Sequence, residues 1–551
     1  MLPRTLLTFL AQIAAVFFIY PAWAQDTVLD LPDVEIIGVT PIPGTGIPVK
    51  NVPSKVQTFD SDDFENSYSL DLSALLESKA SGVSTVDVQN NPFQRGVSYR
   101  GYTSAPLLGE PQGLAVYQNG VRVNEAFGDV MQWDLVPEAA LHRADIISMN
   151  PVFGLNALGG ALSLQLKNGF DFNGINVNTE TGYFGRHGAD VEFGYSGETL
   201  AIYGAIDRAQ DAGWRNRSRS DIERAYVNLG YRTDSLNISW DFIRADNNLN
   251  GNGLAPTELL ESNRRAVFTW PDNTTNDLLS TGITANYFFS DILSIQANTY
   301  YRRMFRKTLN ADEVEATACA YDDSTEDTAN TDLSSGAGNT AIAALSSSLA
   351  TQIAANGGIT SEGGGVTYLC EEEEEDGEIE VLVNQGGNPI PVFAPSKYAA
   401  ANTSSTMTKG WGFGLQTEIA TDILGIENQL IVGGSADYGL TRFHQESFLA
   451  TMTDDRTLLE DVGSFPHINF ATLEIEFNAS EADELSFAVG EVAPTKLQAH
   501  NRYYGIYSTD TFYVNDKLAI TLGARFNIAR ITLDDEFETQ LQNTNITRTG
   551  D

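Results

Sequence analysis

Gly113-Leu-Ala-Val-Tyr-Gln-Asn-Gly-Val-Arg-Val-Asn124 is the stretch that decides how this chain folds. Its Asn-Gly pair stands between two apolar runs and predicts a strand, a tight turn and a second strand. An Arg-Gly turn, Tyr99-Arg-Gly-Tyr102, precedes it, and a run of small residues, Gly154-Leu-Asn-Ala-Leu-Gly-Gly-Ala-Leu-Ser163, follows it. All three motifs fall between Asn91 and Lys167, so we expect them to build one compact unit.

The first residues carry an export pattern. Arg4 precedes an apolar run from Leu6 to Tyr20, and Ala22-Trp-Ala24 offers a small-x-small cleavage site before Gln25. This arrangement predicts a secretory signal peptide over residues 1–24, and the run is shorter than the ~20 residues of a spanning helix. No other stretch is long and apolar enough to span as a helix, so a membrane-embedded mature chain would have to be a closed β-barrel.

Composition favours a barrel over a soluble enzyme. The 551 residues include 48 Gly, 21 Tyr and 28 Phe but only two Cys, and the mean hydropathy is slightly negative. Barrels have such compositions because every second strand residue faces water or the lumen. The formal net charge of -40 argues against a nucleic-acid partner, which requires a basic face.

From residue 170 onward the chain is a succession of alternating segments separated by turn signals. Period-two alternation with aromatics near the ends is typical of outer-membrane strands. Within Leu293–Phe305, the face that runs from Leu293 through Ile295 and Ala297 to Tyr301 is expected to contact lipid. We predict eleven strands, over residues 175–182, 190–195, 200–207, 225–231, 236–244, 278–289, 293–305, 410–420, 429–440, 502–514 and 517–531.

The alternative to a membrane barrel is a soluble β-sandwich or a secreted β-repeat protein, because alternation alone does not exclude either fold. The connections favour the barrel. Tight turns such as Ser196-Gly-Glu198 and Ser290-Asp291 alternate with long polar connections, as expected of short periplasmic turns and longer outer loops. One connection contains Asp246-Asn-Asn248-Leu-Asn250-Gly251, which matches only the first half of a calcium loop, so we expect a plain polar turn there.

The longest connection is predicted over residues 308–407 and is strongly acidic. Between Thr308 and Ser396 it has seventeen Asp or Glu and no Lys or Arg. Such a block stays solvated, either as an acidic mouth that attracts cations or as a lid kept soluble by its charge. Cys319 and Cys370 both lie in it, and in an exported protein they most simply form a local disulfide. They lack the spacing of a zinc site.

The three opening motifs, in their order and spacing, resemble the plug of the TonB-dependent outer-membrane receptors. That resemblance implies an all-β membrane barrel of about 22 antiparallel strands, with a small α+β plug domain in its lumen, here residues 50–169. Val52 to Val88 is then expected to form a strand, a short helix from Leu70 to Ser78 and another strand. The barrel would occupy residues 170–551.

The resemblance also implies how the plug is seated. Arg100 and Arg143 match two plug arginines of the family, which typically meet carboxylates of the barrel wall through parallel hydrogen bonds. The surrounding pattern is altered to Arg143-Ala-Asp145 and Asn150-Pro151, where the family has Arg-x-Glu and Gly-Pro. The altered residues leave the plug assignment intact.

Residues 25–49 are expected to form a periplasmic segment with a TonB box. A short β-prone run flanked by Pro and Gly can serve as an added strand for a partner. By its place and its acidic-then-apolar character, the box falls on Asp33, Val34, Glu35, Ile36, Ile37, Gly38, Val39 and Thr40. The alternative is a plain linker.

Ligand contacts in this family come from plug loops and the barrel interior. The candidates here carry aromatic, amide or acidic side chains on three plug loops, and they serve equally well to pack the plug against the barrel. They are Phe93, Gln94, Glu110, Asp129 and Trp133.

No enzyme is expected. The five His show no metal-ligand spacing, and neither a nucleophile elbow nor a phosphate-binding Gly-Lys-Ser/Thr is present. A porin-like channel would explain the strands but not the plug motifs. The resemblance therefore implies a receptor in the outer membrane of a Gram-negative bacterium, embedded in lipid, that uses no cofactor and imports a scarce ligand with the TonB energy-transducing protein. A ferric siderophore is expected first, with vitamin B12, a saccharide or another metal chelate as alternatives.

The strand count sets a limit on this interpretation. Eleven predicted strands are about half of such a barrel, and the sequence ends at Arg548-Thr-Gly-Asp551 without a terminal aromatic strand. Half a barrel would leave an unpaired edge in lipid, so a C-terminally truncated chain is expected. The alternatives are a split gene, a smaller closed barrel, or a non-transporting surface-binding remnant.

Overall fold

A computed structural model of the chain describes residues 36–67, 71–87, 89–313, 317–320, 367–372, 379–381, 397–452, 457–459, 468–469, 495–515 and 517–535. The expected signal peptide lies outside these residues. By its contacts the chain divides into Met1–Ile36 and Ile37–Asp551, and the plug and the large sheet both belong to the second unit.

The plug is built on a five-stranded sheet. Its strand order is β3-β9-β10-β7-β8, in which β10 and β7 are parallel and the other pairs are antiparallel. A second sheet has the order β4-β5-β6. The bounds are β3 Val56–Asp60, β4 Val83–Val86, β5 Gly96–Tyr99, β6 Tyr102–Ser104, β7 Leu114–Gln118, β8 Val121–Arg122, β9 Leu141–Ser148 and β10 Gly160–Leu166.

The opening motifs form the centre of this plug. All five residues of β7 are buried, as its apolar run predicts. Asn119 and Gly120 both adopt positive φ, 46° and 81°, which is the backbone of a two-residue hairpin turn. Gly160 has φ 145°, and a Cβ on it would lie 2.5 Å from the Ile147 carbonyl oxygen. The small residues of this motif therefore allow β10 to approach β9.

Two helices cover one side of the plug. α3 spans Leu72–Lys79, and the Asp71 side chain caps it by accepting from the Ala74 amide, close to the predicted Leu70–Ser78. α2, Ser61–Ser67, was not expected. The signal for it is a capping box: the Asp63 amide donates to Asp60 at 3.1 Å and the Asp60 amide donates to Asp63 at 3.3 Å. The remaining short elements are β1 Ile36–Ile37, β2 Ile47–Pro48, α4 Thr257–Ser262, and the 3-10 turns η1 Val49–Asn51, η2 Trp133–Leu135, η3 Glu138–Ala140, η4 Pro151–Phe153 and η5 Tyr183–Gly185.

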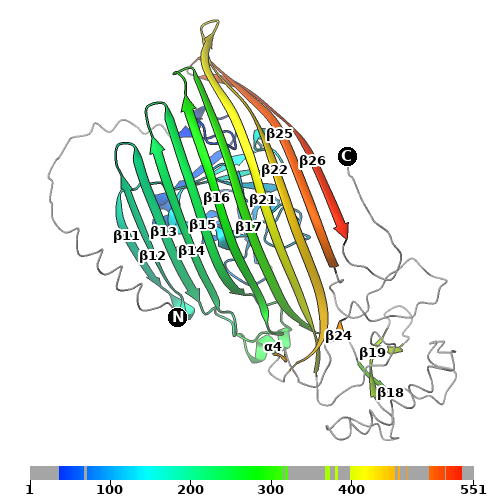
Figure 1. Ribbon diagram of the computed structural model, residues 1–551. Coiled ribbons are helices and arrows are strands. Elements are labelled where there is room, and N and C mark those ends of the chain that lie inside the picture. The colour runs from blue at the N-terminus through cyan, green and yellow to red at the C-terminus, as the bar shows by residue number, and fades with distance from the viewer. Residues whose placement is uncertain are drawn as a thin grey trace, which may run out of the picture. The chain divides into compact units, whose positions relative to one another are not determined.

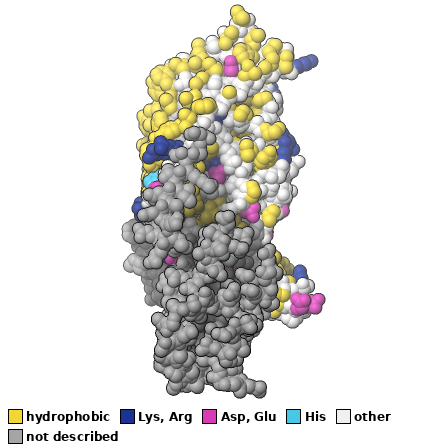
Figure 2. Space-filling model, turned by 90° about the vertical axis from the view of Figure 1, so that its right-hand side faces the viewer, with side chains coloured by type: hydrophobic (Ala, Val, Ile, Leu, Met, Phe, Trp, Pro, Cys, Tyr) yellow, Lys and Arg dark blue, Asp and Glu magenta, His cyan; other side chains and the backbone are white. Residues whose placement is uncertain are grey.

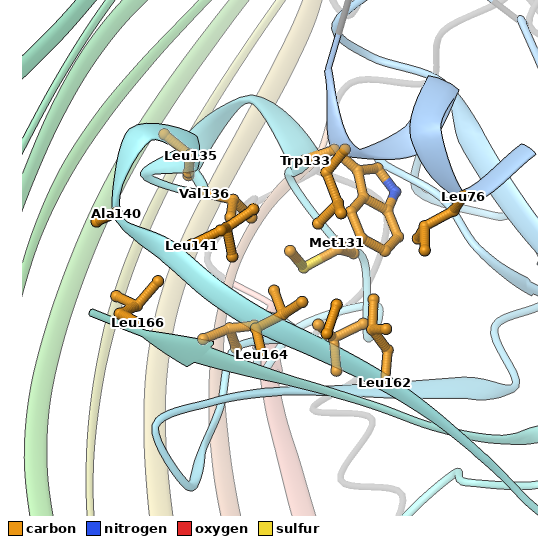
Figure 3. Close-up of a cluster of buried hydrophobic side chains, with 14 of the residues drawn as sticks. Leu76, Met131, Trp133, Leu135, Val136, Ala140, Leu141, Leu162, Leu164 and Leu166 are labelled. Atoms are coloured by element: carbon orange, nitrogen blue, oxygen red, sulfur yellow. The ribbon is translucent and has the colours of Figure 1, made fainter. Parts of the chain in front are cut away.

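The hydrophobic core lies between α3, the β9–β10 pair and the η2 turn. Figure 3 shows Leu76, Met131 and Trp133 pointing toward the leucines of β10. Trp133 is 1% exposed and donates from Nε1 to the Ser104 carbonyl at 3.1 Å. The same buried cluster continues onto the large sheet through Tyr203, Tyr226, Ile243, Leu278 and Met304.

The large sheet confirms the eleven predicted strands, which pair in chain order and antiparallel. Figure 1 shows them side by side from β11 to β26, with the blue and cyan plug elements behind the sheet. Among the described residues β11 pairs only with β12, and β26 only with β25. The bounds are β11 Gly174–Thr181, β12 His187–Ser196, β13 Leu200–Asp211, β14 Ser220–Arg232, β15 Leu236–Asn250, β16 Asp272–Phe288, β17 Leu293–Glu313, β21 Lys397–Ile423, β22 Ile426–Met452, β25 Thr495–Asn515 and β26 Leu518–Asp535.

The strands turn their polar face toward the plug. On β17, Ser294, Gln296 and Asn298 are buried, and Asn298 donates to the Gly120 carbonyl of the plug at 3.0 Å. Tyr301 on the opposite face is 38% exposed. Aliphatic and aromatic side chains gather on the outer face of the other strands too, and Figure 2 shows hydrophobic surface over the upper part of its view. The predicted alternation is confirmed, and it is inverted relative to a soluble protein, as a barrel requires.

Several strands are longer than predicted. β21 and β22 contain 27 residues each, so both run into the segments expected to be loops, and the connection between β17 and β21 spans 314–396 rather than 308–407. The prediction for β21 was short because its added residues, 397–409, are mostly polar or small and carry little hydrophobic signal. Asp246 to Asn250, expected to be a turn, likewise complete β15.

Short strands occur within the long connections. β18 Thr317–Ala320, β19 Thr367–Glu372 and β20 Ile379–Val381 form a small sheet, while β23 Leu458–Leu459 and β24 Ile468–Asn469 pair with β22. The register sets Cys319 opposite Tyr368 and Cys370 opposite Thr317. The two cysteines therefore lie on adjacent strands but are not direct partners, and their disulfide stays a prediction.

We expect Leu164→Ala to destabilise the plug by about 2–5 kcal/mol, because Leu164 is fully buried and its truncation leaves a cavity. Leu158→Ala is the matched control. Leu158 is 63% exposed, so its loss should change stability by no more than about 0.5 kcal/mol. Urea unfolding monitored by tryptophan fluorescence measures both. Equal costs would contradict the position of the core.

Candidate functional site

The interface between the plug and the sheet wall contains buried ion pairs. Glu125, just after β8, accepts from the Arg302 guanidinium of β17 at 2.7 Å, and the two side chains are 3% and 12% exposed. A charge buried to this extent needs its partner, since removal of either one leaves the other uncompensated. This pair ties the central hairpin of the plug to the wall.

A second buried pair holds the end of the plug domain. The Lys167 ammonium, directly after β10, lies 2.8 Å from a Glu192 oxygen of β12. The Tyr203 hydroxyl of β13 donates to the same oxygen at 2.5 Å. The last plug strand is thereby fixed to the first strands of the wall.

Polar side chains of the wall also bind the Met131–Ala140 region. Asn247 of β15 and Asn276 of β16 both donate to Asp134, at 2.8 and 2.9 Å. Arg306 of β17 donates to the Pro106 carbonyl at 2.6 Å. Burial raises the pKa of the Asp134 carboxyl, and the two amides lower it. The wall thus supplies donors and the plug supplies acceptors.

Arg224 of β14 connects the wall to η3. It donates to Asp207 of β13 at 2.7 Å and lies 3.6 Å from Glu138 of the plug. Glu138 also accepts from the Leu72 amide at 3.0 Å, at the start of α3. Burial, opposed by Arg224, raises the pKa of the Glu138 carboxyl to about 7.

Arg143 and Arg100, the two arginines predicted to seat the plug, contact plug residues, and a seating role for them stays a prediction. Arg143 donates to Asp145 at 2.7 Å and to Thr58 at 3.2 Å, both within the plug. Arg100 is exposed at the β5–β6 turn, 5.2 Å from the centre of the Tyr99 ring. The ion pairs of Glu125 and Glu138 have the reverse of the predicted arrangement: the plug holds the carboxylate and the wall holds the arginine. The sequence does not reveal these pairs, because a charged residue on the polar face of a strand can equally well line a water-filled lumen.

The candidate ligand residues are not gathered at one place. Trp133 belongs to the plug core, and Phe93, 4% exposed, packs against Ile222 and Leu249 of the wall. Gln94 is buried, whereas Glu110 is exposed. Asp129 pairs with Arg122 and accepts from Asn156. Phe93 and Trp133 thus stabilise the plug and its seat, and a ligand role for the five residues stays a prediction.

A cavity lies between the central hairpin of the plug and strands β17, β21, β22, β25 and β26. Its lining is rich in tyrosine and charge, and the Tyr300 hydroxyl donates to Asp437 at 2.8 Å. Arg525 of β26 donates to the Val152 carbonyl of the plug at 3.1 Å. The polar lining includes Tyr117, Arg122, Tyr300, Asp437, Tyr503 and Arg525.

The segment before the plug is held against the wall. Ile37 and Val39 are buried in a cluster with Val152, Ile431 and Tyr507. The Asn150 side chain donates to the Val39 carbonyl at 3.0 Å. Farther along, Gln416 donates to the Ile42 carbonyl at 3.2 Å, and the Thr45 amide donates to Glu418 at 3.2 Å. Of the predicted box, Asp33 to Glu35 lie outside the described residues.

Comparison with known proteins identifies the plug and the fold. Residues 48–161 match the family model "TonB-dependent Receptor Plug Domain". No curated protein matches the chain. Within the described residues, no helix has the length and apolarity to cross a membrane, and His, Cys, Asp and Glu form no group of three that could hold a metal ion.

Several solved structures are similar. The ferric-catecholate import receptor Fiu from E. coli K12 in its open form has 11% identity and a TM-score of 0.57, over 89% of this chain and 61% of that one. The ferric citrate transporter FecA, unliganded, has 10% identity and a TM-score of 0.56, over 89% of this chain and 58% of that one. The ferripyoverdine receptor of Pseudomonas aeruginosa, bound to ferripyoverdine, has 11% identity and a TM-score of 0.55, over 92% of this chain and 57% of that one. This chain spans about three-fifths of their length.

We expect plug stability to fall as the pH rises from about 4.5 to 7. The pKa of Glu138 in the folded plug, about 7, lies above its ordinary value of 4.5, so the folded state holds the proton more tightly. That stabilisation is complete below pH 4.5 and is lost through pH 7, with a magnitude of about 1–3 kcal/mol. Urea unfolding across this range measures it. Glu138→Gln should flatten the curve; an unchanged slope would assign the titration to another carboxyl.

Glu125→Gln should destabilise the seated plug by about 3–5 kcal/mol, because it leaves the buried Arg302 without its counter-charge. Hydrogen exchange of the plug amides measures this loss of stability. Glu223→Gln is the matched control: Glu223 pairs with Arg208 on the outer face, where both side chains are more than half exposed, and its change should cost about 0–1 kcal/mol. Similar losses would contradict a buried seat.

Proposed function

Because the chain carries the plug domain and the sheet fold of TonB-dependent receptors, we propose that it belongs to an outer-membrane receptor that binds a scarce ligand and imports it with energy from TonB. The observation that carries this proposal is the seated plug. Buried pairs at Glu125 and Lys167 fix a folded domain against the polar face of the wall. A passive channel needs no such domain.

The connections indicate which side of the protein meets the ligand. β21 and β22 join through Leu424 and Gly425, and the other turns at that end are also short, whereas the opposite end carries the long connections. Long connections face outward in outer-membrane barrels. Asn91 of the plug donates to the Asn250 carbonyl at 3.0 Å, and Phe127 lies 5.7 Å from Phe443 between ring centres. These plug loops therefore approach the outward ends of the strands, where a ligand would arrive.

The TonB contact is proposed at Asp33 to Thr40. Ile37 and Val39 lie near Ile431, toward the end with short turns, which would face the periplasm. Their burial supports a resting state in which TonB must first draw the segment out. Once extended, the segment would add to a sheet edge of TonB through backbone hydrogen bonds.

A ferric siderophore is the proposed ligand. The similar structures include a ferric-catecholate receptor, a ferric citrate transporter and a ferripyoverdine receptor. Fold alone does not set the ligand, so vitamin B12, a saccharide or another chelate remain alternatives. Expression repressed by iron would favour the siderophore, while expression that follows a sugar would favour the saccharide.

Val39→Pro should abolish energised uptake of a ferric siderophore while leaving its binding to cells intact. Proline removes the amide that a paired strand would donate. Val39→Ala is the control, because it keeps that amide, and it should retain most of the uptake. Both variants are measured with radioactive iron in cells that express the full-length receptor. Uptake by Val39→Pro at the wild-type rate would remove this segment as the TonB contact; binding without any uptake in the wild type would identify a surface-binding remnant.

A further inference from the structure

The side chain of Asn150 joins the plug to the segment before it. Its amide nitrogen donates to the Val39 carbonyl at 3.0 Å, and its oxygen accepts from the Val152 amide at 3.1 Å, at the start of η4. Both ends of one side-chain amide are therefore in use. Asn150-Pro151 stands where the family pattern has Gly-Pro, and a glycine has no side chain that could make either contact. The link is thus a feature of this chain and not of the pattern.

The backbone fixes the direction of this side chain. Pro151 follows Asn150 and restricts it to the extended region, where its φ is -95° and its ψ is 108°. Met149 before it has a left-handed φ of 45°, which turns the chain just ahead of Asn150. On the other side, Val152 and Phe153 of η4 are 1% and 0% exposed. The amide is therefore held on a closely packed part of the plug.

The wall supplies a second side-chain amide to the same segment. Gln416 of β21 donates from Nε2 to the Ile42 carbonyl at 3.2 Å and accepts from the Tyr507 hydroxyl at 2.8 Å. The segment lies close against the wall here, because a Cβ on Gly414 would lie 2.8 Å from the Ile42 Cδ1. The plug thus holds the carbonyl of Val39, and the wall holds that of Ile42.

These contacts occupy groups that a partner strand would need. A segment adds to a sheet edge through its backbone amides and carbonyls, and the Val39 carbonyl is not free for such a bond while Asn150 donates to it. A hydrogen bond of this kind contributes modestly to stability, so a partner that binds more strongly can break it. While the bond lasts, it lowers the fraction of receptors that offer the segment, and with it the apparent affinity for the partner.

From these observations we propose that Asn150 is a positioning residue, which withholds the Val39 carbonyl from TonB and so sets how readily TonB binds the receptor at rest. The inference rests on the proposed function, because it takes Asp33 to Thr40 as the TonB contact. Asn150 belongs to the plug and Gln416 to the wall. A movement of the plug along the wall therefore breaks at least one of the two contacts, and the segment becomes easier to withdraw.

The test measures binding of the purified periplasmic domain of TonB to the full-length receptor in detergent, with no ligand added. N150D and N150S each keep an oxygen that accepts from the Val152 amide. The carboxylate has no donor for the Val39 carbonyl, and the serine side chain is one atom shorter than that of asparagine. We expect both variants to bind the TonB domain about threefold to tenfold more tightly than the wild type. Agreement between them shows that the added charge of Asp is not the cause.

N66D is the matched control. Asn66 also donates from its side-chain amide to a backbone carbonyl, that of Asp62 at 2.8 Å, but it lies on α2. N66D should bind the TonB domain like the wild type. Hydrogen exchange measured by mass spectrometry is the second readout. The amides of residues 38–46 should exchange faster in N150D and N150S, whereas those of β7 should keep their wild-type rates, because a general loss of plug stability would accelerate both.

Affinities equal to the wild type in both N150D and N150S, or equal tightening by N66D, would overturn the proposal. Faster exchange of β7 together with the segment would also overturn it. If this happens while Val39→Pro removes TonB binding, only the role of Asn150 is refuted and the proposed TonB contact stands. If Val39→Pro binds the TonB domain as the wild type does, the proposed contact is refuted, and the role of Asn150 with it.

Discussion

The contact between Glu125 and Arg302 shows the constraint on which the rest of the structure depends. It joins residues 177 positions apart, one on the plug and one on the wall. The wall turns most of its apolar side chains outward, so its inner face is largely polar and requires polar partners. The plug provides acceptors such as Glu125 and donors such as Lys167. The plug is therefore seated by charge and hydrogen bonds as well as by its hydrophobic core, which continues onto the wall through Tyr203 and Leu278.

This arrangement explains the differences among the buried residues. Trp133 and Phe93 carry the aromatic character of a binding surface, yet one fills the plug core and the other packs on Ile222 and Leu249. Glu138 lies beside Arg224 of the wall, and burial raises its pKa to about 7.

The two faces of the wall differ in their side chains and in what they contact. The inner face holds the plug and the segment before it, as the contacts of Gln416 and Glu418 show. The outer face carries a row of aromatic side chains, among them Trp411 and Tyr438, and an apolar surface.

The sequence by itself determined the plug motifs, the eleven strands of the wall and the inward direction of their polar face. These features depend on residues that are close in the sequence. The turn requires Asn119 and Gly120, and in a pleated strand successive side chains point to opposite faces. Tertiary structure decided the pairing of charges, the place of Trp133 and the length of β21 and β22. Glu125 shows the difference, because its type was readable but its partner, Arg302, was not. Which carboxylate a cation meets depends on register and strand order, which bring distant residues together and leave no local pattern.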